Sequence, residues 1–182
     1  MRMMLIAGAL ALLAACTPAQ EADVMSEGCD ARGVGVWTVG EENFSVEANT
    51  VGPDCARAVA TLVIRNASGE PIWADARISS DIMTLAPAHD LAAMNAALGE
   101  WTTNSSMMQS TSALSEWPAN ATGPENGEFP FYLNEGYTRE SYEAMRTAND
   151  PMLCYVQGME SLSCVIYGDG GIEQIGLQTF PG

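Results

Sequence analysis

The chain has 182 residues, of which 47% are hydrophobic, and its 23 acidic residues face seven basic ones for a net charge of −16. A protein this acidic is repelled by nucleic acid and by anionic lipid head groups, so nucleic acid is excluded as a partner. Three explanations of the charge stay open, namely a cationic partner, a Ca²⁺ site and simple solubility, and composition alone favours solubility.

The N-terminus has the pattern of a secretory signal. Arg2 precedes the apolar run 5–13, which is too short to be kept as a membrane span. The sequence Leu13-Ala14-Ala15-Cys16 resembles the lipobox of bacterial lipoproteins. That resemblance implies removal of residues 1–15, lipid on the thiol and amino group of Cys16, and several acyl chains that hold the protein on a membrane. The alternative is an ordinary signal peptide followed by an incidental cysteine.

The resemblance also gives a location and a domain plan. Thr17 follows Cys16 where an Asp would imply retention in the inner membrane, so we expect the outer membrane, facing the periplasm. Residues 16–28 are small, polar and acidic and predict a lipidated cysteine with a flexible tether. Residues 29–182 are enough for one globular domain. Without Arg2 the net charge becomes −17, and none of the remaining cations is a lysine.

Strands dominate the first half of this domain. Alternating or continuous apolar residues predict strands at 34–39, 44–48, 58–64 and 72–78, the last two joined by turn residues at 66–71. The strand 58–64 is apolar on both faces, so we expect a helix to cover it.

Two helices follow, with strands after the second. Residues 88–98 carry Leu91, Met94 and Leu98 at helical spacing, with Gly99 as the end of the helix. Residues 138–148 predict the second helix, with Thr138 as its N-cap and Asn149-Asp150-Pro151 as its end. Strands are then predicted at 152–157, 161–167 and 172–180.

Residues 102–127 are the exception, because they are rich in Ser, Thr, Asn and Met and give only a faint helical pattern at 107–114. Structureless loops of this length are usually functional or disordered. Anchoring of the loop on the core is the simpler explanation of the aromatic residues beside it. If the protein has a partner surface, we expect it here, with five aromatic residues as the candidate binding loop: Trp101, Trp117, Phe129, Phe131 and Tyr132.

The four cysteines of the domain predict two disulfides, because an even number in an exported chain is typically oxidised. A hairpin closed by Gly158-Met159-Glu160 places Cys154 opposite Cys164, within the distance that a disulfide requires. The remaining pair is then Cys29 with Cys55. No C-x₂-C spacing supports a zinc site, so we expect the bonds to be structural.

Catalytic and metal-binding motifs are weak. His89 is the single histidine and lies at the start of the predicted helix 88–98, where we expect it to be exposed. No Gly-x-Ser-x-Gly motif is present, and Gly168-Asp169-Gly170-Gly171 lacks the spacing of calcium ligands. We therefore predict no cofactor, no metal and no catalytic residue, although paired carboxylates of a hydrolase could be hidden among 23 acids.

Together these patterns predict an α+β domain: a mainly antiparallel sheet of five to six strands, two helices and two disulfides, held to a membrane by lipid. The leading function is a non-catalytic envelope lipoprotein that binds or scaffolds another envelope component. One alternative is an inhibitor of a cationic enzyme such as a lysozyme, suggested by the charge. The other is a carboxylate-based periplasmic hydrolase.

Overall fold

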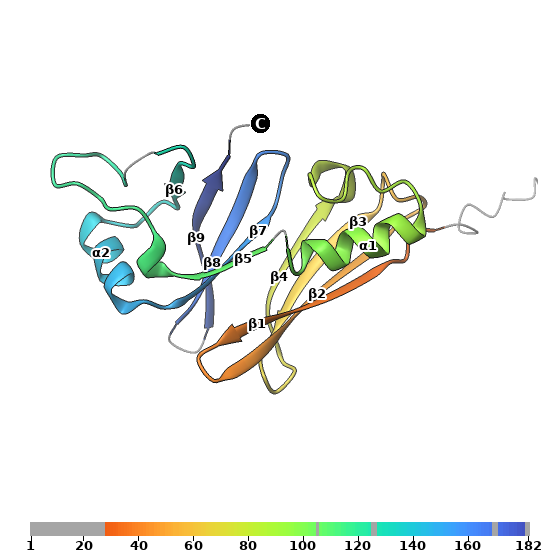
Figure 1. Ribbon diagram of the computed structural model, residues 1–182, viewed down its shortest axis with the longest axis horizontal. Coiled ribbons are helices and arrows are strands. Elements are labelled where there is room, and N and C mark those ends of the chain that lie inside the picture. The colour runs from red at the N-terminus through yellow and green to blue at the C-terminus, as the bar shows by residue number, and fades with distance from the viewer. Residues whose placement is uncertain (1–27, 105, 125–126, 169–170, 181–182) are drawn as a thin grey trace, which may run out of the picture.

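The computed structural model describes residues 28–104, 106–124, 127–168 and 171–180. The predicted signal, Cys16 and nearly all of the tether lie outside the described residues. The fold is α+β with two antiparallel sheets (Figure 1). The first sheet has four strands in chain order, β1 Arg32–Val39, β2 Glu42–Val51, β3 Val59–Arg65 and β4 Pro71–Ile78. The second has the order β5-β7-β8-β9-β6, with β5 Ser106–Ser110, β6 Phe131–Leu133, β7 Pro151–Val156, β8 Ser161–Gly168 and β9 Gly171–Thr179.

The prediction of a single sheet of five to six strands is therefore wrong. Strands β7 and β8 are buried along almost their whole length, on both faces. Strands of this kind need cover on both sides. The first sheet lies against one face, where Trp73 of β4 contacts Tyr155 of β7, so the strands divide between two sheets that pack on each other. Helix α2 (Arg139–Ala148) is joined to the segment after β5, where Thr111 donates to the carbonyl of Met145.

The first sheet is a meander of hairpins whose inner side chains are buried. Strand β1 pairs with β2 from Arg32 opposite Asn49 to Val39 opposite Glu42, around a two-residue turn in which Gly40 has a φ of 62°. A positive φ suits glycine, which has no Cβ to clash. The outer face is uncovered, with Val34 and Val36 more than half exposed.

Helix α1 (Leu91–Trp101) packs on the inner face of β1 and begins three residues later than predicted. Asp90 is its N-cap and accepts a hydrogen bond from the N–H of Ala93. Gly35 lets the helix approach closely, since a Cβ there would lie 2.0 Å from the carbonyl oxygen of Thr102. The helix thus covers β1 and part of β2, and the expectation that it covers 58–64 is wrong.

The alternation in β4 is present, but its polar side faces inward. Trp73 donates its Nε1–H to the hydroxyl of Tyr155 in β7 (3.2 Å), and that hydroxyl donates to Oδ2 of Asp75 (3.1 Å). Arg77 donates to Asp75 and to Oε1 of Gln157. Side chains of β4 therefore join the two sheets through hydrogen bonds, with the apolar residues of β4 on the outer surface.

The remaining elements are helix α2 and two short 3₁₀ helices, η1 Ser79–Asp81 and η2 Thr111–Ala113. Helix α2 begins as predicted, with Thr138 as N-cap in a capping box with Ser141. It ends at Asn149, which adopts a left-handed conformation (φ 58°) before the strand-initiating Pro151. Within the described residues, no helix has the length and apolar character needed to cross a membrane.

Both predicted disulfides are confirmed. Cys154 lies directly opposite Cys164 in the β7–β8 hairpin, and the N–H of Gln157 donates to the carbonyl of Ser161 as the register requires. Cys29 bonds to Cys55 and so holds the start of the domain to the loop between β2 and β3. All four cysteines are buried.

Candidate functional site

The residues of the candidate binding loop are brought together around β6, apart from Trp101. Trp101 is 1% exposed, donates its Nε1–H to the carbonyl of Val156 (2.7 Å) and meets Tyr155 edge to face. It belongs to the core between α1 and β7. Trp117, Phe129, Phe131 and Tyr132 lie in and around β6 and line the hollows described next.

The first hollow, which we name the aromatic cleft, has a volume of about 280 Å³ and lies beside β6. Its walls combine aromatic rings with short polar side chains. Residues that line it are Trp117, Thr122, Gly123, Pro124 and the continuous segment 131–137. Tyr132 is 54% exposed at its edge, whereas Phe131 is buried beneath it. The cleft therefore offers flat apolar surfaces with polar groups at the rim.

Trp117 is held in place from several directions. Its backbone N–H donates to Oε1 of Glu143 (3.0 Å), its carbonyl accepts from Nε of Arg139 (2.7 Å) and its Nε1–H donates to the carbonyl of Ala121 (3.0 Å). The ring also meets that of Tyr142 edge to face at 5.7 Å. The backbone hydrogen bond from Trp117, together with Arg146, lowers the pKa of Glu143 and keeps this carboxylate charged. The loop 115–121 is thus fastened to α2, and the indole is preorganised.

The opposite wall of the cleft is fastened to β9. Asn134 donates its backbone N–H to the carbonyl of Ile175 (2.9 Å) and its side-chain amide to the carbonyl of Gln174 (2.6 Å). The hydroxyl of Tyr137 donates to Oε1 of Glu173 (2.7 Å). Burial and the adjacent carboxylate raise the pKa of Tyr137, so its hydroxyl stays protonated and acts as a donor. The sequence patterns do not predict a role for Asn134 or Tyr137. Their closeness in the chain to Tyr132 is the one feature of the sequence that points to them.

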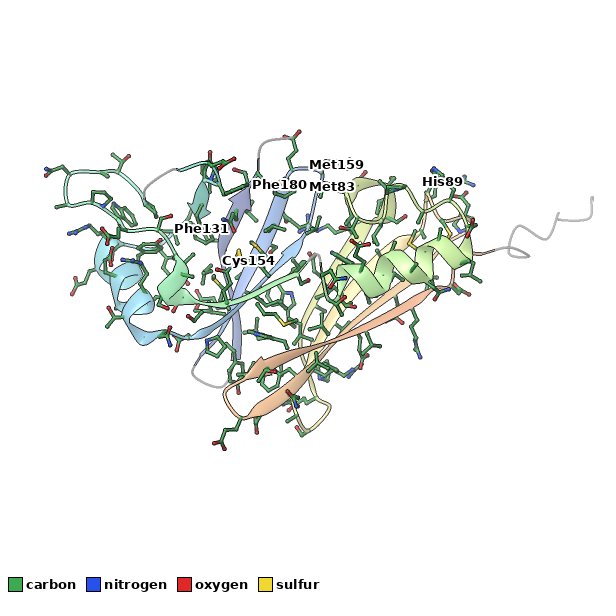
Figure 2. The ribbon with its side chains drawn as sticks, viewed as in Figure 1. Met83, His89, Phe131, Cys154, Met159 and Phe180 are labelled. Atoms are coloured by element: carbon green, nitrogen blue, oxygen red, sulfur yellow. A yellow bond between two sulfur atoms is a disulfide. The ribbon has the colours of Figure 1, made fainter. Side chains whose placement is uncertain are left out.

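A second hollow, the apolar groove, lies across the outer face of β8 and β9. It has a volume of about 250 Å³, and its lining residues are Met107, Phe129, Leu162, Gln178, Thr179 and Phe180. A smaller hollow lined by Phe129, Phe131 and Gln178 connects it to the aromatic cleft. In Figure 2, Phe131 and Phe180 both lie in the half of the molecule that holds the second sheet and Cys154. We refer to the cleft and the groove together as the aromatic face.

The faint helical pattern at 107–114 does not correspond to an α-helix, and the structure places Met107 in the apolar groove. Residues Ser106–Ser110 form β5 and pair with β7, with Met107 opposite Cys154. Because alternate side chains of a strand point to opposite faces, Met107 joins the apolar groove whereas Met108 points to the other side.

His89 lies far from the aromatic face, at the other end of the molecule (Figure 2). It is exposed as predicted and lines a hollow of about 570 Å³ with Asp54 and Asp90. Both carboxylates are occupied, because Asp90 caps α1 and Asp54 pairs with Arg57. Among the described residues, no group of three His, Cys, Asp or Glu side chains could hold a metal ion.

Comparisons with known proteins add no relative: no family model, no curated protein and no solved structure matches this chain.

Proposed function

We propose that this chain is a non-catalytic envelope lipoprotein that binds another envelope component through its aromatic face. Lipid on Cys16 would hold it on the outer membrane facing the periplasm, and residues 16–28 would tether the domain 29–182. The observation that carries the binding proposal is the fixed position of Trp117, whose backbone and indole groups all have partners on α2 and its own loop. A rigid aromatic ring at the surface binds with little loss of conformational freedom.

The chemistry of the aromatic face favours binding over catalysis. Its exposed side chains include the aromatic rings of Phe129 and Tyr132, and two polar residues at its rim, Asn134 and Tyr137, already donate to a backbone carbonyl and a carboxylate. The carboxylates Glu143 and Glu173 each hold a structural hydrogen bond. Such groups orient a ligand but supply no free acid and base pair for a hydrolase.

The membrane anchor is tested by mass and by partitioning. The native protein should partition into detergent with the membrane fraction and carry acyl chains on its N-terminal residue, Cys16. Cys16→Ala should leave an unlipidated precursor. A wild-type protein without added acyl mass would contradict the proposed location, while leaving the binding proposal untouched.

The binding proposal is tested by crosslinking in envelope extract, identification of the captured component and titration with that component in purified form. Tyr132→Ala and Phe129→Ala should each weaken binding by about tenfold or more, as expected for exposed aromatic anchors. Leu91→Ala removes an exposed apolar side chain on α1 and serves as the matched control, with unchanged affinity. Equal affinities for all variants would show that the aromatic face is not the binding surface.

A cationic partner is the sharper version of this proposal, and a lysozyme is the probe for it. Steering by a net charge of −17 weakens as salt rises, because the screening length is about 10 Å at 0.1 M and about 3 Å at 1 M. An inhibitor would bind one-to-one and saturably near 0.15 M salt. Loss of binding at that salt would reject the inhibitor function, and hydrolysis of an envelope polymer by the pure protein would reject the non-catalytic one.

A further inference from the structure

The edges of the two sheets differ in how well they are protected against pairing with another strand. In the second sheet the edge strands are short, since β5 has five residues and β6 has three. In the first sheet β4 begins at Pro71, has a register shift beside it and directs Trp73, Asp75 and Arg77 to the second sheet. Strand β1 has eight residues, pairs with β2 without a shift and contains no proline or lysine. Short length, an edge proline and a register shift usually prevent the addition of another strand, and β1 has none of the three.

The free backbone groups of β1 follow from its pairing with β2. Val39 and Glu42 flank the two-residue turn, and the carbonyl of Ala31 accepts from the N–H of Thr50. Odd-numbered residues of β1 therefore bond to β2, because hydrogen-bonding direction alternates along an antiparallel strand. The N–H and C=O groups of Val34, Val36 and Thr38 point away from the sheet, and no backbone partner among the described residues reaches them.

One end of this edge is already closed. The N–H of Arg32, which also points outward, donates to Oδ1 of Asn95 in α1 (2.9 Å). The open edge is therefore the segment Val34–Thr38, backed on the inner face by α1, whose backbone lies against Gly33 and Gly35. Val34 and Val36 are 59% and 54% exposed on the outer face. The edge is held rigid by the helix and presents two apolar side chains beside its free backbone groups.

The charges around the edge indicate which strand would bind. Asp30 precedes β1, and the exposed pair Glu41-Glu42 follows it, so both ends are acidic. Glu47 lies beside Val34 on the outer face but is paired with Arg65 (3.1 Å), and Nε of Arg32 donates to Oδ1 of Asn49 (2.9 Å), so the acids available to a bound strand are Asp30 and Glu41-Glu42. A second copy would bring the same acids and a charge of −17 to this edge. Like charges at that distance oppose association, whereas lysine or arginine would favour it.

We propose that the open edge of β1 binds an extended basic segment of another protein by strand addition. The segment adds a fifth strand to the first sheet, with its backbone bonded to Val34, Val36 and Thr38. Its β-branched side chains lie beside Val34 and Val36, and its cations lie near Asp30 and Glu41-Glu42. This surface is on the other sheet from the aromatic face, and it goes beyond the function proposed there.

The test uses the full chain in mild detergent and a fluorescent synthetic peptide, Lys-Val-Thr-Val-Thr-Val-Lys, with fluorescence anisotropy as the measurement. We expect saturable one-to-one binding near 0.15 M salt. The same peptide with glutamate in place of lysine should bind at least tenfold more weakly, and so should a peptide N-methylated at alternate residues. A peptide that binds equally well with glutamate ends or a methylated backbone would overturn the proposal.

Val36→Pro tests the protein side, because it removes an outward N–H at an edge position where proline is tolerated. It should weaken binding by about tenfold, whereas Val36→Thr keeps the N–H and should stay within about threefold of wild type. Circular dichroism checks the fold of both variants, and the N-methylated peptide against wild type gives the same information if Val36→Pro does not fold. A dimer of the chain that Val36→Pro disrupts, without peptide binding, would overturn the proposal in favour of a second copy.

Discussion

The two sheets of this domain are built from different kinds of contact. In the first sheet every strand pairs with its neighbour in the chain, and a two-residue turn sets the register of β1 and β2. In the second sheet the edge strands come from distant segments, with Ser106 opposite Tyr155 and Phe131 opposite Gln178. Pairings between distant segments carry a larger cost in chain entropy and leave a weaker local pattern in the sequence.

Each sheet therefore serves a different purpose in our proposals. The first sheet is regular, leaves an open edge and an uncovered face, and is suited to pairing with another strand. The second sheet packs against the first sheet on one face and carries loops that hold aromatic rings at fixed positions. Substitutions in one sheet, measured against the other sheet or against a matched position, can therefore test this difference.

The largest expected effect comes from the disulfides, one in each half of the chain. Replacing both cysteines of a pair with alanine should cost about 2–5 kcal/mol in the free energy of unfolding. Cys29–Cys55 closes a longer loop than Cys154–Cys164, with separations of 26 and 10 residues. The chain-entropy model then makes its removal costlier by about 0.8 kcal/mol. Urea unfolding of the two double variants measures the difference, and the opposite order would assign the second disulfide a packing role beyond loop closure.

The disulfides also show how far the sequence can lead. The glycine-containing turn fixes which residues of the β7–β8 hairpin face each other, and this local rule predicted Cys154–Cys164 and, by elimination, Cys29–Cys55. No such rule exists for β5. Its sequence, Ser106–Ser110, is short and lacks β-branched residues, and its partner lies more than forty residues away. The segment Ser106–Ser110 has only a faint helical pattern, and it forms a strand because it pairs with β7.

The candidate site was predictable in the same uneven way. The four aromatic residues in and beside the long polar loop can be recognised from the sequence, and they do line the aromatic face. Trp101 was included although it follows Met94 and Leu98 at helical spacing, which is the pattern of a buried face. That β4 turns its polar side inward could not be predicted, because it depends on Tyr155 of the other sheet.

The second prediction concerns pH and the contact between the sheets. Burial raises the pKa of Tyr155 from 10.0 to about 12, with Asp75 contributing. The folded state therefore favours the neutral phenol, and its stabilising effect is complete below pH 10 and is lost as pH rises from 10 to 12. The loss amounts to about 2–3 kcal/mol by the linkage relation. No lysine titrates in this interval, since the chain has none.

Tyr155→Phe separates this effect from other causes. The variant should be less stable than wild type at neutral pH by about 1 kcal/mol, since Trp73 and Asp75 lose a hydrogen-bonding partner. Its stability should fall less between pH 10 and 12. Tyr137 and Tyr142 contribute the remaining decline, because burial also raises the pKa of Tyr137 and raises that of Tyr142 to about 12. Urea unfolding at a series of pH values measures both. Parallel declines in wild type and variant would contradict the assignment to Tyr155.

The third prediction concerns the close approach of α1 to the first sheet. Gly35→Ala places a methyl group against the backbone of Thr102 and should cost about 1–3 kcal/mol, which corresponds to a lower melting temperature by about 2–12 °C. Gly123→Ala is the control, because a Cβ at Gly123 meets no atom within 4 Å. A melting temperature unchanged in Gly35→Ala would mean that the helix can move away from β1 without loss.

The smallest effect is expected from cutting the loop before β6, and it tests which parts of the second half are held firmly. Phe129 is 50% exposed and Glu128 is exposed, whereas Ser106–Ser110 pairs with β7 and Trp117 is bonded to α2. Proteases cut where local opening requires little free energy. Within the domain 29–182, a glutamate-specific protease should therefore cut first after Glu128, and thermolysin before Phe129. The long stretch 59–78 of the first sheet should stay intact, since its backbone groups are paired on both sides of β3.

Because the loop contributes few buried apolar side chains, the nicked protein should keep its melting temperature within about 2 °C. Limited proteolysis followed by mass spectrometry gives the order of the cuts. A first cut in β3 or β4 would reverse the contrast between the sheets, and a cut at Met107 before Phe129 would mean that β5 opens more readily than its pairing with β7 implies.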